Sequence, residues 1–228
     1  MSKIFLVDAD DTILDFHGVA NKSLVYAFES MGLEWKEEYL AQYKKVNDGL
    51  WQALERRELT RADLMSKRFH WFLPTIGYNN LDFDKFNETY LSYLSTNPEY
   101  FNGAETFLKE LAKIGRVYIV TNGTKNIQKS RFDISNLWSY AEKVFISEEV
   151  GYDKPAKEYT AYVMKNIPKF TLENCYWIGD SISADIKAAN EAGIKSIWFN
   201  PQGKAVSGEI IPDFDARNFE EILEFCKK

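Results

Sequence analysis

Three carboxylates follow a short apolar segment near the N-terminus of the chain. Residues 3–7 (Lys-Ile-Phe-Leu-Val) are too apolar for a strand with one wet face and too few for a lone helix, so they predict a buried parallel strand. Asp8, Asp10 and Asp11 come directly after it. Carboxylates this close repel one another, and a divalent cation would neutralise them because hard cations prefer oxygen ligands. We therefore expect a ligand site at this strand end; the alternative is an acidic turn.

Further polar side chains that could take part in catalysis or ligand binding follow later apolar segments of the chain. They are Thr121, Lys154, Asp180 and Asp185. Three of them have a plain alternative when taken alone: Thr121 as a helix N-cap, Lys154 as an exposed loop residue before a proline, and Asp185 as a favourable charge in the first turn of a helix. Their recurrence at segment ends favours a shared site, because the carboxyl ends of parallel strands meet at one edge of a sheet.

The apolar segments alternate with helical patterns from Gly103 onward. The strands predicted after the first are residues 117–120, 144–146, 176–178 and 196–199. Helical periodicity separates them, for example over residues 184–192. This alternation predicts βαβ units and therefore an α/β fold with a parallel sheet.

Residues 18–96 show helical periodicity and no convincing strand pattern. Thr60-Arg-Ala-Asp63 resembles a capping box, with Asp63 in the place that Glu usually holds. Phe69 fits a helical core position, and aromatic residues recur through the segment. We expect about four helices here, forming a separate module inserted in the α/β chain.

The bulk composition narrows the class of protein. The chain has 228 residues, of which 45% are hydrophobic, so it can bury a sizeable core. A net charge of −6 argues against a partner that is a nucleic acid polymer. Cys175 and Cys226 lie at no metal-ligand spacing and predict reduced thiols in a cytoplasmic protein. No signal peptide or membrane span is predicted.

These candidate site residues, in their order along the chain, resemble the four motifs of the haloacid dehalogenase (HAD) superfamily. The matching positions are Asp8-x-Asp10-x-Thr12, Thr121, Lys154, and Gly179-Asp180 with Asp185. Finer matches resemble the YjjG-type pyrimidine 5′-nucleotidases, at Leu50-Trp51, Arg68-Phe69, Thr121-Asn122-Gly123 with Gln128 and Arg131, residues 147–155, and residues 198–201. Asp11 stands where Gly is commonest in the superfamily.

This resemblance implies a doubly wound, Rossmann-like parallel-sheet core at residues 1–16 and 98–228, with an inserted four-helix cap at residues 17–97. It also implies a magnesium-dependent phosphomonoester hydrolase with an aspartyl-phosphate intermediate. The expected substrates are small phosphorylated molecules, preferably (deoxy)pyrimidine nucleoside monophosphates, which would make the enzyme a 5′-nucleotidase. We expect a monomer or homodimer without membrane partners.

The resemblance assigns a role to each matched residue. Asp8 would be the nucleophile, and Asp10 the general acid and base. Magnesium would be held by Asp8, Asp180 and the backbone carbonyl of Asp10, and Asp185 would support its water ligands. The phosphate would be held by Thr121, Asn122, Gly123 and Lys154.

Several alternatives stay open at this stage. Other HAD hydrolases, namely a sugar-phosphate phosphatase, a phosphomutase or a 2-haloacid dehalogenase, share the motifs, as could a non-catalytic binding protein on the same scaffold. A dehalogenase needs neither an acid for its leaving group nor a metal, so Asp10 and Asp180 argue against it. Trp51 and Arg68 are candidate substrate contacts in the cap, with a core position for Trp51 and a solvated position for Arg68 as alternatives. Gln128 and Arg131 are expected to secure the helix that follows Thr121.

Overall fold

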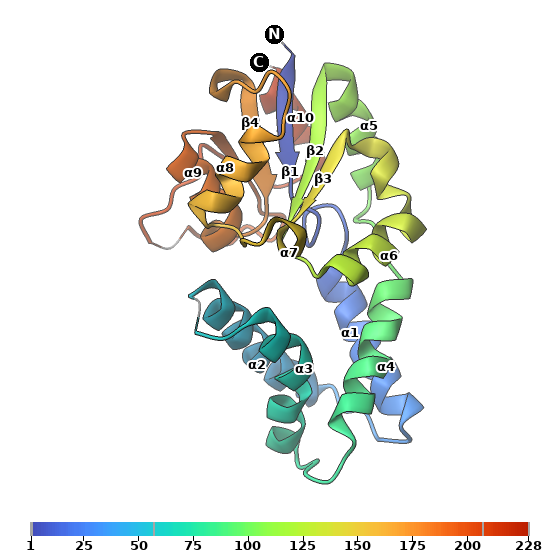
Figure 1. Ribbon diagram of the computed structural model, residues 1–228. Helices are drawn as coiled ribbons and strands as arrows, with labels where there is room; N and C mark the ends of the chain where they lie inside the picture. The colour runs from blue at the N-terminus through green and yellow to red at the C-terminus, as the bar shows by residue number, and fades with distance from the viewer. Residues whose placement is uncertain (1, 57, 207, 228) are drawn as a thin grey trace. The chain divides into compact units, whose positions relative to one another are not determined.

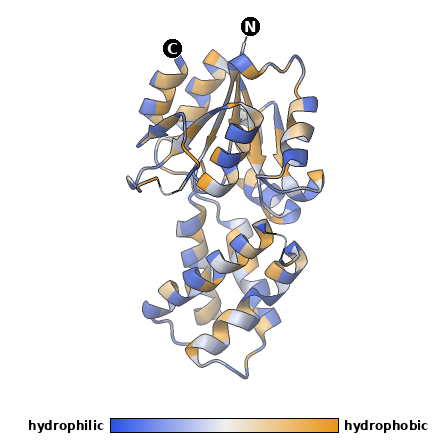
Figure 2. Cartoon of the chain, turned by 90° about the vertical axis from the view of Figure 1, so that its left-hand side faces the viewer, coloured by the Kyte–Doolittle hydropathy of each residue, from blue (hydrophilic) through white to orange (hydrophobic). Residues whose placement is uncertain are grey.

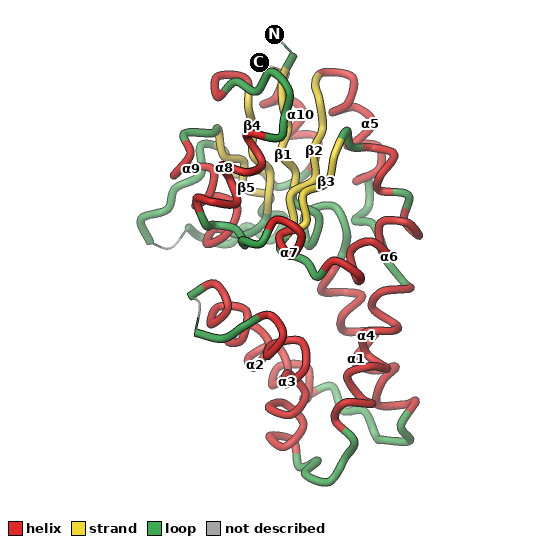
Figure 3. The backbone as a smooth tube through the Cα atoms, in the orientation of Figure 1, coloured by secondary structure: helices red, strands yellow, loops and turns green. Residues whose placement is uncertain are grey.

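The computed structural model describes residues 2–56, 58–206 and 208–227. The chain divides into two compact units, one made of Met1–Phe16 with Pro98–Lys228 and the other of His17–Asn97 (Figure 1). In Figure 3 all the strands of the described residues belong to the first unit. None of the described helices combines the length and the apolarity that a bilayer span requires.

The first unit contains, within its described residues, a six-stranded parallel sheet in the order β3-β2-β1-β4-β5-β6. The strands are β1 (Lys3–Val7), β2 (Gly115–Thr121), β3 (Lys143–Ile146), β4 (Cys175–Gly179), β5 (Lys195–Phe199) and β6 (Phe214–Ala216). Strand β1 lies between β2 and β4, and Val7 is in register with Ile119 and Ile178. The predicted parallel sheet is confirmed. Of these six strands, β6 was not predicted, because three residues (Phe-Asp-Ala) are too few to show the alternating pattern of a strand.

Helices cover both faces of this sheet, which makes the fold doubly wound. Side chains alternate along β1: Phe5 and Val7 pack on one face, and Ile4 and Leu6 pack on the other. The first face is covered by α5 (Ala104–Ile114), α6 (Lys125–Ser135) and α10 (Phe219–Lys227). The second face is covered by α8 (Lys157–Lys165) and α9 (Lys187–Ala192). Because both faces are buried, the strands are apolar along their whole length.

Short helical turns connect these elements. They are α7 (Ser147–Val150), the 3-10 turns Leu137–Tyr140 and Leu172–Asn174, and a π-helical turn at Ile182–Ile186 that leads into α9. Two of them, α7 and the π-helical turn, follow the carboxyl ends of β3 and β4. The helix predicted over residues 184–192 is therefore present but starts as a π turn. Asp11 adopts a left-handed backbone with φ 59°. Aspartate tolerates this conformation better than most residues, which explains how it can stand where Gly is commonest in the superfamily.

The regular secondary structure of the second unit is all helical within its described residues. Its helices are α1 (Phe16–Ser30), α2 (Glu38–Glu55), α3 (Arg61–Phe72) and α4 (Phe83–Thr96), with a 3-10 turn at Leu73–Ile76. Figure 2 shows hydrophilic and hydrophobic residues interleaved along these helices, as expected for amphipathic elements. The capping box is confirmed: the Thr60 hydroxyl accepts from the Asp63 N–H, and the Asp63 carboxylate accepts from the Thr60 N–H.

Aromatic side chains form the core of this helical unit. Phe69 lies against Tyr43, Phe86 and Tyr90, with ring centroids 4.8 to 5.8 Å apart. The Tyr43 and Tyr90 hydroxyls are hydrogen-bonded at 2.9 Å, so their polar ends are satisfied inside the core. The predicted core position of Phe69 is confirmed by its complete burial.

Candidate active site

Asp8 lies directly beyond the carboxyl end of the central strand β1. Its backbone N–H donates to the Ile178 carbonyl at 2.8 Å, which continues the pairing of β1 with β4 by one residue. The side chain is buried. Thr121 ends the neighbouring strand β2, and Asp180 follows β4. The parallel order of these three strands therefore brings residues from distant parts of the sequence to one sheet edge.

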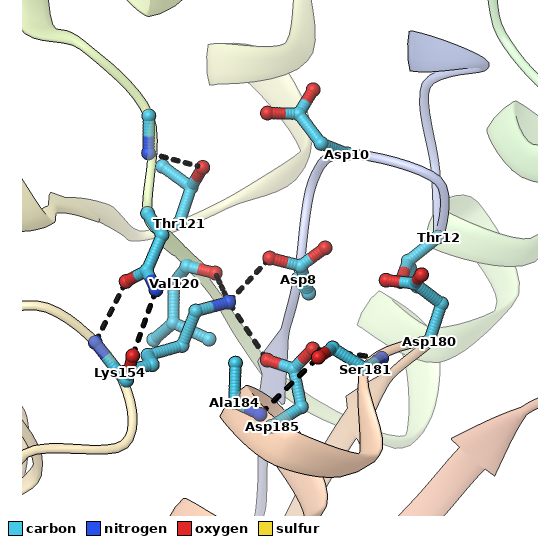
Figure 4. Close-up of polar contacts among 12 residues, drawn as sticks. Asp8, Asp10, Thr12, Val120, Thr121, Lys154, Asp180, Ser181, Ala184 and Asp185 are labelled. Atoms are coloured by element: carbon cyan, nitrogen blue, oxygen red, sulfur yellow. Dashed lines mark hydrogen bonds and ion pairs between the residues drawn. The ribbon is translucent and has the colours of Figure 1, made fainter. Parts of the chain in front are cut away.

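Lys154 places a buried ammonium group between two carboxylates. Its Nζ donates to Asp8 Oδ1 at 2.5 Å, Asp185 Oδ1 at 2.7 Å and the Val120 carbonyl at 3.0 Å, as Figure 4 shows. Asn122 fastens the loop that carries this lysine. The Asn122 amide donates to the Lys154 carbonyl at 2.9 Å, and its oxygen accepts from the Lys154 N–H at 2.7 Å. With 2% exposure, Lys154 is not a solvated loop residue.

Burial sets the electrostatics of this cluster. It raises the pKa of Asp8 well above the ordinary value, Lys154 opposes this rise, and the carboxylates of Asp185, Asp180 and Asp10 add to it. For Lys154, burial disfavours the charged form, but the attraction of Asp185 and Asp8 outweighs it and raises the pKa of the ammonium. Lys154 therefore stays protonated. Further positive charge beside Asp8 would favour its ionised form.

The carboxylates of Asp8, Asp180 and Asp185 form a candidate cation site. One oxygen from each lies within 4.8 Å of the others. An all-oxygen set of this kind suits a hard divalent cation such as magnesium. Asp185 already accepts hydrogen bonds from Lys154, from the Trp177 indole at 3.2 Å and from the Ser181 N–H at 3.3 Å. These bonds hold Asp185 in place, and they leave Asp8 and Asp180 as the better placed direct ligands.

Gly179 is required by the close approach of Asp185. A Cβ atom at position 179 would lie 2.3 Å from the Asp185 Cγ, a distance that real contacts do not reach. The glycine before Asp180 thus gives the carboxylate of Asp185 its room. Sequence reasoning placed this glycine in a motif without giving it a physical role.

Thr121 carries a buried hydroxyl at the end of β2. Its Oγ1 accepts from the Gly123 N–H at 3.2 Å and from Gln128 Nε2 at 2.9 Å. Helix α6 begins at Lys125 after Thr124, so Thr121 is not the N-cap of this helix. The backbone amides of Asn122 and Gly123, which we also expect to hold the phosphate, lie in the loop before this helix and not in its first turn.

Asp10 is held by two side chains of α6. Its Oδ1 accepts from Arg131 Nη1 at 2.5 Å, and its Oδ2 accepts from Gln128 Nε2 at 2.8 Å. In Figure 4 its carboxylate points away from Asp8, and Asp10 contributes no carboxylate to the oxygen cluster formed by Asp8, Asp180 and Asp185. Sequence reasoning missed this contact. The available signal was a pair of polar residues three positions apart, and therefore on one helix face.

The two candidate substrate contacts of the helical unit differ in accessibility. Trp51 is half-buried, with the Arg61 guanidinium 5.7 Å from its ring centroid. Arg68 is only 2% exposed, and its guanidinium lies 4.8 Å from the Tyr90 ring and 5.2 Å from the Phe69 ring. The solvated position considered for Arg68 is therefore wrong. Of the two, Trp51 has the more available surface.

Comparison with known proteins identifies the class to which this fold and this carboxylate site belong. Residues 2–193 match the haloacid dehalogenase-like hydrolase family, and the chain belongs to that family. It is therefore a HAD hydrolase. The family match covers every residue that sequence analysis proposed for the site.

Individual relatives share nearly the whole length of the chain. The HAD-hydrolase YfnB of Bacillus subtilis is 37% identical over 96% of this chain and 93% of its own. The pyrimidine 5′-nucleotidase PynA of Streptococcus pneumoniae is 30% identical, over 99% and 95% of the two chains. The pyrimidine 5′-nucleotidase YjjG of Escherichia coli is 25% identical, over 96% of each. These relatives bear out the resemblance to YjjG-like HAD phosphatases.

A crystal structure of YfnB also matches the fold closely. The TM-score is 0.93 at 36% identity, covering 100% of this chain and 99% of that one. That structure is described as bound to magnesium and as revealing interdomain movement. A HAD relative with bound magnesium is consistent with the oxygen-only cluster around Asp8.

Proposed function

We propose that this HAD hydrolase is a magnesium-dependent phosphomonoesterase that acts through an aspartyl-phosphate at Asp8. The observation that carries the proposal is the buried Asp8–Lys154 pair inside a carboxylate cluster at the end of β1. A buried carboxylate with an ammonium partner is positioned as a nucleophile, and a phosphate group needs the surrounding positive charge. Phosphoryl transfer depends mainly on such positioning and charge neutralisation.

The proposed reaction has two steps, each assigned to residues of this chain. An oxygen of Asp8 attacks the phosphorus, the bond to the ester oxygen breaks, and Asp10 gives its proton to the departing alkoxide. Asp10 then takes a proton from a water molecule that attacks the aspartyl-phosphate, releasing inorganic phosphate and regenerating Asp8. Lys154 and the Thr121 hydroxyl stabilise the charge on the phosphate oxygens.

Magnesium is the group that this site would hold. Its ligands would be the carboxylates of Asp8 and Asp180 and the backbone carbonyl of Asp10, with Asp185 holding its water ligands in position. When bound, it neutralises negative charge shared by the phosphate and the carboxylates. The retained acid at Asp10 and carboxylate at Asp180 argue against haloacid dehalogenase chemistry, which uses neither.

The proposed substrate class is the (deoxy)pyrimidine nucleoside 5′-monophosphates. Two full-length relatives, PynA and YjjG, are named pyrimidine 5′-nucleotidases. The half-buried Trp51 offers a ring on which a planar base could stack, an interaction worth about 1–3 kcal/mol. Trp51→Ala is therefore expected to raise KM for the nucleotide more than KM for para-nitrophenyl phosphate. Arg68 remains a second proposed contact, although its burial means that it would need to move.

Phosphate release from a panel of phosphomonoesters tests this proposal. The panel contains pyrimidine and purine nucleoside monophosphates, hexose phosphates and para-nitrophenyl phosphate, each with magnesium and with EDTA. We expect hydrolysis that requires magnesium and favours pyrimidine nucleotides. Full activity in EDTA would refute the magnesium dependence. A preference for a hexose phosphate would refute the nucleotidase assignment alone, and no release from any ester would refute the phosphatase.

A further inference from the structure

A buried chain of hydrogen bonds joins Asp10 to Thr121 through two side chains of α6. Arg131 Nη1 donates to Asp10 Oδ1 at 2.5 Å and to Gln128 Oε1 at 2.7 Å. Gln128 Nε2 donates to Asp10 Oδ2 at 2.8 Å and to Thr121 Oγ1 at 2.9 Å. Arg131 is 0% exposed and Gln128 is 1% exposed, whereas the Asp10 side chain at the end of the chain of contacts is 24% exposed. We call these four residues the Asp10–Thr121 network.

The direction of each hydrogen bond in this network follows from chemistry. Arginine can only donate, and Asp10 in its ionised form, the form that takes the proton from water in the second step, can only accept. Gln128 must therefore present its oxygen to Arg131 and its nitrogen to Asp10, which leaves its second N–H for Thr121. The Thr121 oxygen accepts from both Gln128 and the Gly123 N–H. With both of its acceptor positions used, the Thr121 hydroxyl is oriented to donate its own proton, which suits a phosphate oxygen.

Two neighbouring features fit a positional role for these side chains. A Cβ atom at Gly123 would lie 2.2 Å from Gln128 Cγ, so only glycine at this position leaves space for the Gln128 side chain. The Arg131 guanidinium lies 5.3 Å from the Phe16 ring, and its buried Nε and Nη2 have no hydrogen-bond partner among the residues that the structure describes. Leaving buried polar atoms unsatisfied costs stability. A side chain that only secured the helix would not need a buried guanidinium group, with its cost in stability.

We propose that Arg131 and Gln128 are positioning residues of the active site: Arg131 orients Asp10 for proton transfer, and Gln128 orients both Asp10 and the Thr121 hydroxyl. This inference rests on the proposed phosphatase function. It replaces the expectation that both side chains merely secure the helix after Thr121. Among the residues that the structure describes, Arg131 hydrogen-bonds to Asp10 and Gln128, whereas Gln128 also hydrogen-bonds to Thr121, so we expect the two variants to have different kinetic effects.

Leaving-group dependence separates positioning from structural support. A nucleotide leaves as a poor alkoxide that needs protonation by Asp10, whereas para-nitrophenolate leaves readily without an acid. Arg131→Met is expected to lower kcat/KM for a nucleoside monophosphate by about 10²-fold, the lower end of general acid–base effects, and to change kcat/KM for para-nitrophenyl phosphate much less. Gln128→Leu should show the same bias and also weaken inhibition by inorganic phosphate, because Thr121 loses its orientation.

Matched variants control for folding and for the helix itself. Lys129→Ala alters a partly exposed residue of the same helix, ion-paired with Glu149 at 2.8 Å, and should leave kcat/KM for both substrates unchanged. If Arg131→Met does not fold, Arg131→Lys keeps the charge but loses the guanidinium geometry, and should show the same leaving-group bias. In an Asp10→Asn background, Arg131→Met should cause little further loss, because coupled residues are not additive.

Three kinds of result would overturn this inference. If Arg131→Met lowered kcat/KM equally for both substrates, or lowered it by its full factor again in the Asp10→Asn background, Arg131 would have a structural role only. A folded Arg131→Met enzyme with wild-type kcat/KM on the nucleotide would show that Asp10 needs no such support. A wild-type protein without phosphatase activity would refute the proposed function itself, and this inference with it.

Discussion

Lys154 is the residue that balances the carboxylates around Asp8. Replacing it by methionine removes the ammonium with little change in volume and leaves Asp8 and Asp185 without their shared partner. We expect Lys154→Met to lower turnover by at least about 10²-fold, because one preorganised charge contact is typically worth that much. Breaking a buried ion pair should also cost about 3–5 kcal/mol of stability in EDTA.

Steady-state kinetics and thermal unfolding, each with and without magnesium, measure these two effects of Lys154→Met. Lys157→Met is the matched control, since Lys157 is exposed at the start of α8. A Lys154→Met protein that is folded and retains wild-type turnover would remove this lysine from the proposed mechanism. Residue types and their order were enough to predict Lys154, because it is the lysine in the ordered set of four motifs. Its burial could be learned only from the fold.

Strand β4 delivers Asp180 and Asp185 to the site, and Gly179 at its end sets how closely Asp185 can approach. In Gly179→Ala the new Cβ would overlap the Asp185 carboxylate, at 2.3 Å from its Cγ. Asp185 must then move away from Lys154 and Trp177. We expect a weaker apparent affinity for magnesium and a lower turnover, measured by titrating the metal in the phosphatase assay.

Gly49→Ala is the control for Gly179→Ala. Gly49 lies inside α2, and nothing would meet a Cβ there within 4 Å. Alanine in a helix interior is more favourable than glycine by about 0.5–1 kcal/mol, so this variant should be at least as stable as wild type. Unchanged magnesium affinity in a folded Gly179→Ala protein would contradict the role given to Asp185.

Most elements could be predicted because their patterns are local. Strand β1 was predicted with the bounds that it has, since a five-residue apolar run before polar residues allows few alternatives. The start of α6 was harder, because Thr121 and Thr124 are both acceptable N-caps by type, and only the chain's path decides between them. The Arg131–Asp10 contact was not predicted, since it joins residues 121 positions apart and the spacing of Gln128 and Arg131 shows only that they share a helix face.

At the scale of the whole molecule, the proposed catalytic and metal-binding residues belong to one unit of the chain, and the candidate contact to the base belongs to the other. Asp8, Thr121, Lys154 and Asp180 lie in the unit built on the parallel sheet, and Trp51 lies in the helical unit. The alternation of strand and helix patterns was sufficient to predict the sheet, because βαβ units have few ways to pack. Substrate preference could not be predicted in the same way, because it depends on which side chains face the ligand.

The sheet unit also buries both cysteines, which gives a global test of the fold. Burial raises the pKa of Cys175 and of Cys226 to about 12. An unfolded thiol ionises near pH 8.5, so at pH 8 thiolate forms mainly when the chain opens. We expect slow alkylation by iodoacetamide under native conditions and fast alkylation of both thiols in urea, followed by mass spectrometry. Fast labelling of either cysteine in the native protein would contradict its burial.

Trapping the aspartyl-phosphate tests the central claim most directly. In Asp10→Asn, para-nitrophenyl phosphate can still phosphorylate Asp8, because its leaving group needs no acid, but water is not activated for the second step. With magnesium present, we predict a burst of one nitrophenolate per enzyme. Borohydride reduction followed by peptide mass spectrometry should then find homoserine at position 8. Absence of both the burst and the modification, together with phosphatase activity in a folded Asp8→Asn protein, would contradict the assignment of Asp8 as the nucleophile.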